Sequence, residues 1–467
     1  MSTMGESTEI DYATLSHCWG NSMPLKLTKE TLAAFEERIP FLLIPPTFTE
    51  TINIARSIGI RYIWIDSLCI VQDDPEDWER EAAQMNRIYA GSQLTIAAAQ
   101  SSDYSGGCFH NDFQDQHGLD LFFKAQLGNP NDSPTLVRFY QGNVRDRPIR
   151  RNRLSTRAWT LQEQLLSSRL VSRLHPELHW QCRTEHKTEG GLVFKSPSEA
   201  GNSVIACLPR IGPQGQPWLR VVWESIVEQY TARELTDETD RLAAFAGILR
   251  YFQSAFNEKP MIGLWKSALA RDMAWVRLGV RENLAANPHI PSWTWLSCTG
   301  QASMSFFDIT DVSPRTTEGA SSHIEFLSWD IHWAGLPYTS PVKGSNLHVK
   351  GPVMDIEIGP SGDGVSRNPQ YLQVFGENLT YTDRTKIPFR CVGQLDKGDI
   401  DRTASYPCLL LSSRTGDDTE GPTQEIFLIL EPVKPEIDAR YRRIGIAKLR
   451  SRAPVFDLNK TKSLTLV

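Results

Sequence analysis

The chain has 467 residues, and its 49 Lys and Arg against 55 Asp and Glu give a formal net charge of −6. A mildly acidic protein is not expected to bind nucleic acid through its overall charge. Hydrophobic residues make up 40% of the sequence, which is enough for more than one core and excludes wholesale disorder. The length predicts two or three domains.

Neither a membrane span nor a secretory signal is expected. No apolar run reaches the roughly 18 residues that a spanning helix needs, and residues 1–11 are polar and acidic. The 8 cysteines include no Cys-x-x-Cys pair, which indicates reduced thiols. Pro176 interrupts the helix on which His175, His179 and Cys182 would have to hold zinc, so no metal site is predicted. We therefore predict a cytoplasmic protein.

Strand and helix signals alternate over the first hundred residues. The predicted strands are 12–16, 62–66 and 94–99, and the predicted helices run from Thr47 to Gly59 and from Asp74-Pro75 to Gly91. The second strand is almost continuously apolar, as expected for a strand buried on both faces of a sheet. This order of elements predicts a parallel sheet with right-handed crossovers.

The later parts of the chain have a different pattern. A helix is predicted over 156–167, two short strands over 169–182, and helical character between 218 and 276. Beyond about residue 320, six short strands separated by turn residues predict an antiparallel β-rich subdomain. They are 346–357, 371–375, 389–394, 408–411, 425–430 and 441–449.

Glu81 lies within the apolar stripe of the helix that begins at Asp74-Pro75. At about 100° per residue from Trp78, it falls at about −60°, between Met85 and Ile88. A buried carboxyl group has a raised pKa, which suits proton transfer. The alternative is a glutamate at the edge of the stripe that reaches solvent or pairs with an arginine.

Polar residues follow two of the predicted parallel strands. The first strand ends in Ser16-His17-Cys18-Trp19-Gly20, and the second ends at Asp66-Ser67. In open α/β sheets ligands bind outside the carboxyl ends of the strands. These segments and the early turns of the Glu81 helix therefore predict a cleft with an aromatic side chain, polar groups and a carboxylate.

An arginine-rich segment precedes the predicted helix over 156–167. Residues 145–157 contain six arginines, which fit a phosphate or an acidic partner, or else a solvated loop. In the helix that follows, Trp159 shares one face with Gln162 and Glu163. Phosphate-loop, dinucleotide-fold, nucleophile-elbow and HExxH motifs do not occur, so the enzyme classes that they mark are not expected.

Ordered segments over about residues 12–170 resemble the fungal heterokaryon incompatibility (HET) domain. They are Tyr12-Ala-Thr-Leu-Ser-His-Cys-Trp-Gly20, Leu43-Ile-Pro-Pro-Thr-Phe48, Gly59-Ile-Arg-Tyr-Ile-Trp-Ile-Asp-Ser-Leu-Cys-Ile-Val-Gln-Asp-Asp74, Asp77-Trp78 with Glu81-Ala82, Ile88-Tyr-Ala90 and Arg157-Ala-Trp-Thr-Leu-Gln-Glu163. With this resemblance we divide the chain into a HET domain at 1–185, a mostly helical connection at 186–320 and a β-rich subdomain at 321–467.

The resemblance implies a role in fungal non-self recognition that leads to programmed cell death. HET domains are similar to TIR domains, so the implied fold is an α/β flavodoxin-like parallel sheet with flanking helices. Some TIR domains cleave NAD with a glutamate near a tryptophan, and Trp78 with Glu81 resembles that pair, at i, i+3 rather than i, i+4. In addition, His17 follows Ser16 at a position where a tyrosine is more usual.

The resemblance also implies roles for individual residues. Glu81 is the candidate catalytic residue, and it would stabilise the oxocarbenium-like ribose of NAD. Trp19 would stack on a ring, Asp66 with Ser67 would orient the sugar, and Arg157 would contact the pyrophosphate. The remaining candidate substrate-binding residues are Ser16, Gly20, Trp78, Trp159 and Glu163. NAD is expected as a substrate, and no cofactor is expected.

A second hypothesis needs no catalysis. In it the domain is a signalling module that kills by assembling with itself or with a recognition partner protein. In a third hypothesis, the protein neither cleaves NAD nor kills by assembly. The first two hypotheses differ in whether Glu81 or an oligomerisation surface is required for toxicity.

Overall fold

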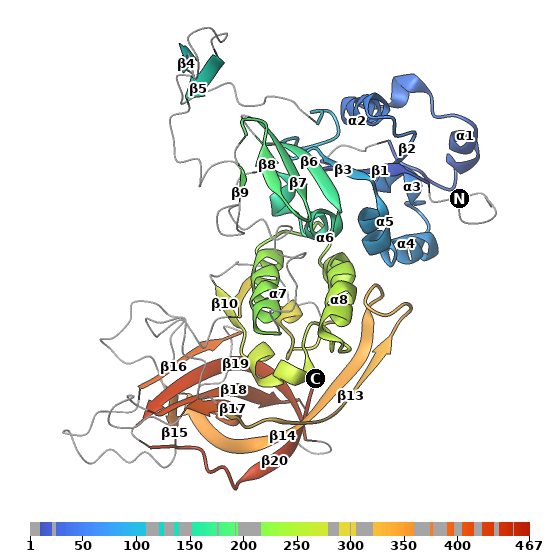
Figure 1. Cartoon of the computed structure of the whole chain (residues 1–467). Helices are drawn as coiled ribbons and strands as arrows, with labels where there is room; N and C mark the ends of the chain where they lie inside the picture. Colours follow the sequence, from blue (N-terminus) through green and yellow to red (C-terminus); the bar gives the residue numbers. More distant parts are fainter. Residues whose placement is uncertain are drawn as a thin grey trace. The chain divides into compact units, whose positions relative to one another are not determined.

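The chain forms two compact units, residues 1–215 and 216–467 (Figure 1). The computed structural model describes residues 10–20, 25–108, 121–125, 135–139, 152–174, 177–191, 193–194, 216–278, 289–298, 300–304, 321–358, 374–376, 390–396, 404–414, 423–433, 439–451 and 453–467. The predicted boundary near residue 320 falls within the second unit and stays a prediction.

A mixed seven-stranded sheet organises the first unit. Its parallel half has the order β2-β1-β3-β6, and its other half continues from β6 through the antiparallel strands β7, β8 and β9. The strands are β1 (Tyr12–Ser16), β2 (Tyr62–Trp64), β3 (Leu94–Ala97), β6 (Arg169–Leu174), β7 (Glu177–Cys182), β8 (His186–Thr188) and β9 (Val193–Phe194). The predicted parallel sheet is confirmed for the first four strands. A separate hairpin, β4 (Leu121–Ala125) with β5 (Thr135–Phe139), was not predicted.

The two faces of β1 pack against different helices (Figure 1). Ala13 and Leu15 form an apolar core with Phe48 of α2 (Pro46–Ser57). Because side chains alternate along a strand, Thr14 and Ser16 point to the other face, which carries α5 (Met85–Gly91) and α6 (Trp159–Leu166). The hydroxyl groups of that face hydrogen bond one another, so the buried polar groups are satisfied.

Strand β2 is an edge strand, which corrects one prediction. It pairs only with β1 in the sheet order, ends at Trp64, and leaves 45% of Tyr62 exposed. An apolar run does not distinguish an edge strand from a central one, since the sheet order depends on contacts far apart in the sequence. Asp66 then begins the short helix α3 (Asp66–Cys69) instead of ending the strand.

The helix that begins at Asp74-Pro75 is also shorter than predicted. It divides into α4 (Pro75–Ala82) and α5, separated by a turn in which the Gln84 amide donates to the Glu81 carbonyl. This hydrogen bond to the carbonyl three residues earlier makes a tight turn, and the second helix begins after it. The angles calculated for one continuous helix therefore do not relate Glu81 to Met85 and Ile88.

The first unit contains three further short helices: α1 (Leu32–Glu37), η1 (Phe41–Leu43) and η2 (Leu154–Thr156). Gly59 ends α2 with a φ of 79°, which a glycine adopts without steric cost. Within the described residues, no helix is long and apolar enough to cross a membrane.

The helical part of the second unit is built on aromatic side chains. Trp223 of α7 (Gln216–Thr231) is fully buried and packs against Phe245 and Phe252 of α8 (Ala243–Phe256), and against Trp265 and Trp295. The shorter elements that follow are η5 (Glu238–Arg241), η6 (Lys266–Ala268), α9 (Leu269–Asp272), β10 (Val276–Leu278), η7 (Trp295–Ser297) and β11 (Gln301–Ser303).

A large, mostly antiparallel sheet completes this unit, as the sequence predicts. It closes on itself because β14 pairs with both β17 and β20, and among its described strands only β19 and β20 pair in parallel. Its strands are β12 (Ser321–Ser322), β13 (Glu325–Trp333), β14 (Val342–Ile358), β15 (Val374–Gly376), β16 (Arg390–Leu395), β17 (Ser405–Arg414), β18 (Thr423–Pro432), β19 (Arg440–Ser451) and β20 (Thr461–Leu466). Leu410, Phe427 and Ile446 are among its fully buried residues.

Candidate functional site

The candidate site lies where β1, β2 and β3 end. The chain runs from β1 to β2 on one side and then crosses back past β1 to β3 on the other, so the strand order reverses at β1. Such a switch in strand order opens a crevice at the carboxyl ends of the strands. The segment after β1 begins with His17, and the segment after β2 leads into Asp66.

A buried hydrogen bond joins Ser16 to Glu163. The Ser16 hydroxyl donates to Oε2 of Glu163 at 2.5 Å, across 147 residues of chain. Burial raises the pKa of Glu163 to about 7; the negative charge of Asp66 adds to this rise, while the Ser16 hydroxyl and Arg157 oppose it. A carboxyl group that titrates near neutral pH is suited to proton transfer.

The Asp66 carboxylate is held by two hydrogen bonds and is still partly exposed to solvent. Its side chain is 23% exposed, and Oδ2 accepts a hydrogen bond from the Trp19 indole at 2.9 Å. Oδ1 accepts the Ser67 backbone amide at 2.7 Å. These bonds fix the carboxylate while leaving part of it open to a ligand.

His17 is a buried polar side chain without a hydrogen bond. Among the residues that the structure describes, neither ring nitrogen has a hydrogen-bond partner, although Nδ1 lies 3.8 Å from Oδ1 of Asp66 and the ring contacts Phe48 edge-on. Burial lowers the pKa of His17, Arg157 lowers it further, and Asp66 opposes both. The imidazole is therefore neutral near pH 7. The Ser67 hydroxyl is also buried and unpartnered.

Arg157 belongs to the same cluster. It stands between η2 and α6 and is partly buried. Its charge acts on His17, Cys18 and Glu163 together, since it lowers the pKa of each. We call Ser16, His17, Trp19, Asp66, Ser67, Arg157 and Glu163 the β1-edge cluster.

Glu81 lies on α4, and its charge also reaches Cys69 of α3, whose pKa is raised by burial and further by Asp66 and Glu81. Burial raises the pKa of Glu81, with Asp77 adding to the rise and Arg80 opposing it. Nε of Arg80 is 3.8 Å from its carboxylate, as the alternative interpretation of this glutamate predicted. Among the described residues, no hydrogen bond or ion pair joins Glu81 to the β1-edge cluster.

The other predicted site residues lie at different places. Trp78 of α4 and Trp159 of α6 form an edge-to-face pair with centroids 6.1 Å apart. Gly20 is exposed, has a φ of 73°, and would bring an added Cβ to 2.3 Å from Cβ of Asp103. Only glycine fits at this turn. Of the arginine-rich segment, residues 145–151 lie outside the described residues.

Sequence reasoning did not assign functions to His17 and Tyr89. Tyr89 is fully buried, and its hydroxyl donates to the Leu15 carbonyl at 3.2 Å and also lowers the pKa of Glu163. His17 adjoins Ser16 in the sequence, but its lack of a partner is visible only in the structure. Within the described part of the chain, no group of three or more His, Cys, Asp or Glu could hold a metal ion. His175, one of the three residues weighed and rejected as a zinc site, is not among the described residues.

One comparison with known proteins finds a match within the first unit. Residues 12–163 match the family model of the heterokaryon incompatibility protein (HET). This segment is a HET domain. The match spans every residue of the β1-edge cluster, from Ser16 to Glu163, and all of α4. Searches of curated proteins and of solved structures gave no match.

The HET domain suggests a role in heterokaryon incompatibility. Ser16 ends β1 and Asp66 follows β2, and the hydrogen bonds of Trp19 and Ser16 join these strand ends to each other and to α6. The site is thus built from residues that are far apart in the sequence.

Proposed function

We propose that this protein is an effector of heterokaryon incompatibility that causes programmed cell death by cleaving NAD in its HET domain. The family match supports the biological role. The observation that supports the chemistry is the β1-edge cluster. It combines a partly exposed carboxylate at Asp66, a cation at Arg157 and a buried carboxyl group that titrates near pH 7.

In this proposal Asp66 accepts hydrogen bonds from the ribose hydroxyls, and Arg157 binds the pyrophosphate. Trp19 offers a ring for stacking, at the position where its indole bonds to Asp66. Ser67 acts through Asp66, because its own side chain is fully buried.

The reaction is a hydrolysis. The bond between C1 of the ribose and the nicotinamide nitrogen breaks, water adds its hydroxyl to C1, and a proton is released with ADP-ribose and nicotinamide. Glu81 is the catalytic residue that we propose, because its partly buried carboxylate lies near enough to Cys69, at the end of the helix that Asp66 begins, to add to the rise that burial gives the pKa of that thiol. A carboxylate at this place would stabilise positive charge on the ribose. Glu163 supports the site from within the core.

The test is NAD consumption by the purified full-length chain. We expect nicotinamide to appear with the wild type, and Glu81→Gln to lower the rate by at least about tenfold because the charge is lost. Glu76→Gln is the matched control, since Glu76 is an exposed residue of the same helix. A folded Glu81→Gln protein with the wild-type rate would refute the assignment of Glu81, and a wild type that leaves NAD intact would refute the reaction.

A second candidate function is killing by self-assembly, and one surface feature favours it. Phe41, Leu42 and Leu43 of η1 are 67%, 96% and 52% exposed. Consecutive exposed apolar side chains of this kind are typical of contact surfaces. The occupant that we propose is the same surface of a second copy of the chain.

Leu42→Asp tests this candidate. We expect it to convert oligomers to monomers in sedimentation velocity and to abolish toxicity, because a charge would be buried in the contact. NAD consumption at saturating substrate would stay unchanged. Leu458→Asp, at a residue 48% exposed in the second unit, is the control. If the wild type is itself monomeric over the range of concentrations tested, self-assembly through η1 is wrong.

A further inference from the structure

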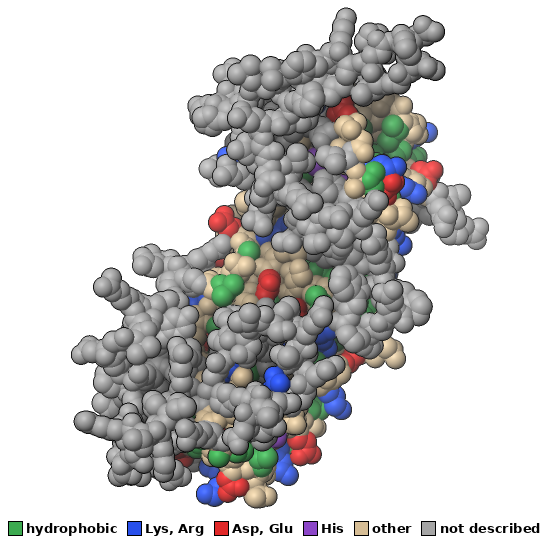
Figure 2. Space-filling view, turned by 60° about the vertical axis from the view of Figure 1, so that its left-hand side comes forward, with side chains coloured by type: hydrophobic (Ala, Val, Ile, Leu, Met, Phe, Trp, Pro, Cys, Tyr) green, Lys and Arg blue, Asp and Glu red, His purple; other side chains and the backbone are tan. Residues whose placement is uncertain are grey.

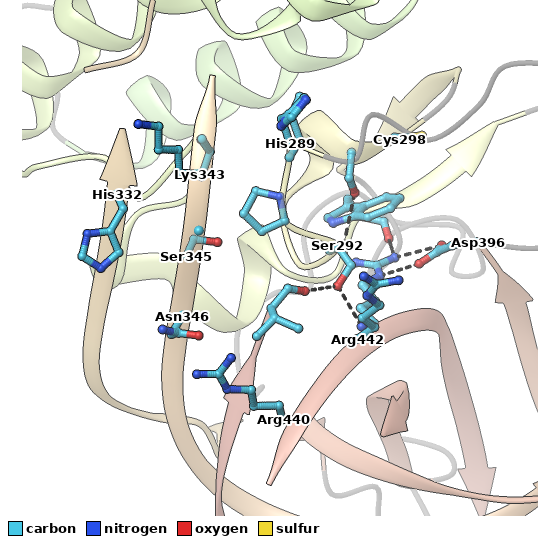
Figure 3. A pocket seen from close by; sticks show the side chains of 18 of the residues that line it. His289, Ser292, Cys298, His332, Lys343, Ser345, Asn346, Asp396, Arg440 and Arg442 are labelled. Carbon is cyan, nitrogen blue, oxygen red and sulfur yellow. Dashed lines mark hydrogen bonds and ion pairs between the residues drawn. The ribbon is translucent and has the colours of Figure 1, made fainter. Parts of the chain in front are cut away.

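The second unit contains a cavity of about 530 Å³ that belongs to neither proposed function. Figure 3 shows side chains of β13 and β14 on one side of it, and the segment 289–298 with β19 on the other. A volume of this size matches pockets that take small organic ligands and exceeds what an inorganic ion requires.

The charges that line the cavity are mostly positive. Five Lys or Arg side chains face one carboxylate, and they are Arg277, Lys343, Arg440, Arg442 and Arg443 against Asp396. The whole chain has a net charge of −6, so this concentration of cations is not a general property of the protein. A cleft lined by one sign of charge attracts ligands of the opposite sign.

The one side-chain carboxylate of the lining is already neutralised. Nε of the fully buried Arg443 donates to Asp396 at 2.9 Å, and its two terminal nitrogens donate to the carbonyls of Met273 and Trp275, each at 2.6 Å. The guanidinium also stacks on the Trp275 ring, with Cζ 3.4 Å from the centroid. Arg443 and Asp396 therefore form a fixed, neutral wall.

Three of the remaining cations have no counter-ion. Within the described residues, Arg277, Lys343 and Arg442 form no ion pair, and Nε of Arg277 is buried without a hydrogen-bond partner. Arg277 lines the cavity, so the charge of its guanidinium group favours an anionic ligand there. Lys343 and Arg442 are exposed and can approach such a ligand from the cavity mouth.

Neutral side chains complete the lining. Ser345 and Asn346 of β14 supply hydrogen-bonding groups, whereas Ile290, Pro291 and Val342 supply apolar surface. Ser292 is held in place because its hydroxyl donates to the Val467 carbonyl at 2.5 Å and accepts the Arg443 amide at 3.0 Å. The cavity thus offers cations for phosphate and an apolar surface for an organic group.

We propose that this cavity binds a phosphate-bearing small molecule of nucleotide size. Guanidinium groups suit phosphate because they present planar pairs of donors to its oxygens. Several uncompensated cations match the charge of a diphosphate better than that of one carboxylate.

The test is calorimetric titration of the full-length chain with ADP, inorganic pyrophosphate and adenosine. We expect ADP and pyrophosphate to bind, more weakly as salt concentration rises, and adenosine not to bind. The double variant Lys343→Gln/Arg442→Gln should weaken ADP binding by at least about tenfold, because two charged contacts are lost. Both substituted residues are exposed, so the fold is expected to persist.

Lys462→Gln is the matched control, because Lys462 is an exposed lysine of β20 outside the cavity. It should leave ADP binding at the wild-type affinity. The proposal is overturned if the wild type binds neither ADP nor pyrophosphate, or if adenosine binds as tightly as ADP. ADP binding that is unaffected by the double variant would belong to another site, the HET domain included, and would overturn it too.

Discussion

Trp223→Ala is expected to destabilise the second unit by about 3–5 kcal/mol, the usual cost of truncating a buried tryptophan. The Trp223 ring contacts Phe245, Phe252, Trp265 and Trp295 at centroid distances of 5.7, 5.1, 5.2 and 6.2 Å. Its indole nitrogen has no partner within the described residues. The loss therefore comes from packing and burial rather than from a hydrogen bond.

Hydrogen exchange followed by mass spectrometry measures this loss in the full chain. Amides of α7 and α8 that exchange by unfolding of the unit should exchange at least about a hundredfold faster in the variant. Val221→Ala is the control, since Val221 lies on the same helix and is 52% exposed. Equal protection in the Trp223→Ala protein and the control would mean that this aromatic cluster does not stabilise the unit.

Local patterns predicted the elements of both units better than their arrangement. The strand at 12–16 and the β-rich end are confirmed, and the strand predicted at 94–99 forms over Leu94–Ala97. These predictions hold because periodicity and turn residues act over short distances. The position of β2 at the sheet edge was missed, because Tyr62-Ile-Trp has the same apolar pattern in either position. The break after Ala82 was missed as well, since neither glycine nor proline marks it.

For the candidate site as well, the sequence predicted which residues lie at the strand ends but not the long-range contacts that they make. Placing Ser16 and Asp66 at one end of the sheet required only the direction of parallel strands. The bond between Ser16 and Glu163 joins residues 147 positions apart, and nothing in a single sequence fixes such a contact.

Figure 2 shows acidic, basic and apolar side chains interspersed over the described surface of that view. The net charge of the whole chain is a sum over such mixed charges, so it did not predict the basic cavity.

Glu163→Gln should remove a pH dependence from the stability of the HET domain. Burial raises the pKa of Glu163 from 4.5 to about 7, so the folded protein holds a proton that the unfolded chain releases. Stability is therefore lost as the pH rises from about 4.5 to about 7, by about 3 kcal/mol in all. The neutral glutamine keeps the shape of the side chain and has no such loss.

Urea unfolding at constant ionic strength, between pH 5 and pH 8, gives the comparison. The difference between the two proteins isolates Glu163 from Asp272, whose pKa burial also raises to about 7. Relative to the wild type, Glu163→Gln should gain stability as the pH rises, while the exposed Glu76→Gln should follow the wild type. Parallel curves for Glu163→Gln and the wild type would show that Glu163 keeps an ordinary pKa.

The same titration bears on ligand binding, because Arg157 acts on both Glu163 and any anion in the crevice. A bound phosphate partly neutralises Arg157, which removes an influence that lowers the pKa of Glu163. Binding should therefore be accompanied by proton uptake near pH 7, and Glu163→Gln should abolish that uptake. Calorimetry in two buffers of different ionisation enthalpy measures this proton uptake directly. If the uptake is unchanged in Glu163→Gln, the group that takes up the proton is not Glu163.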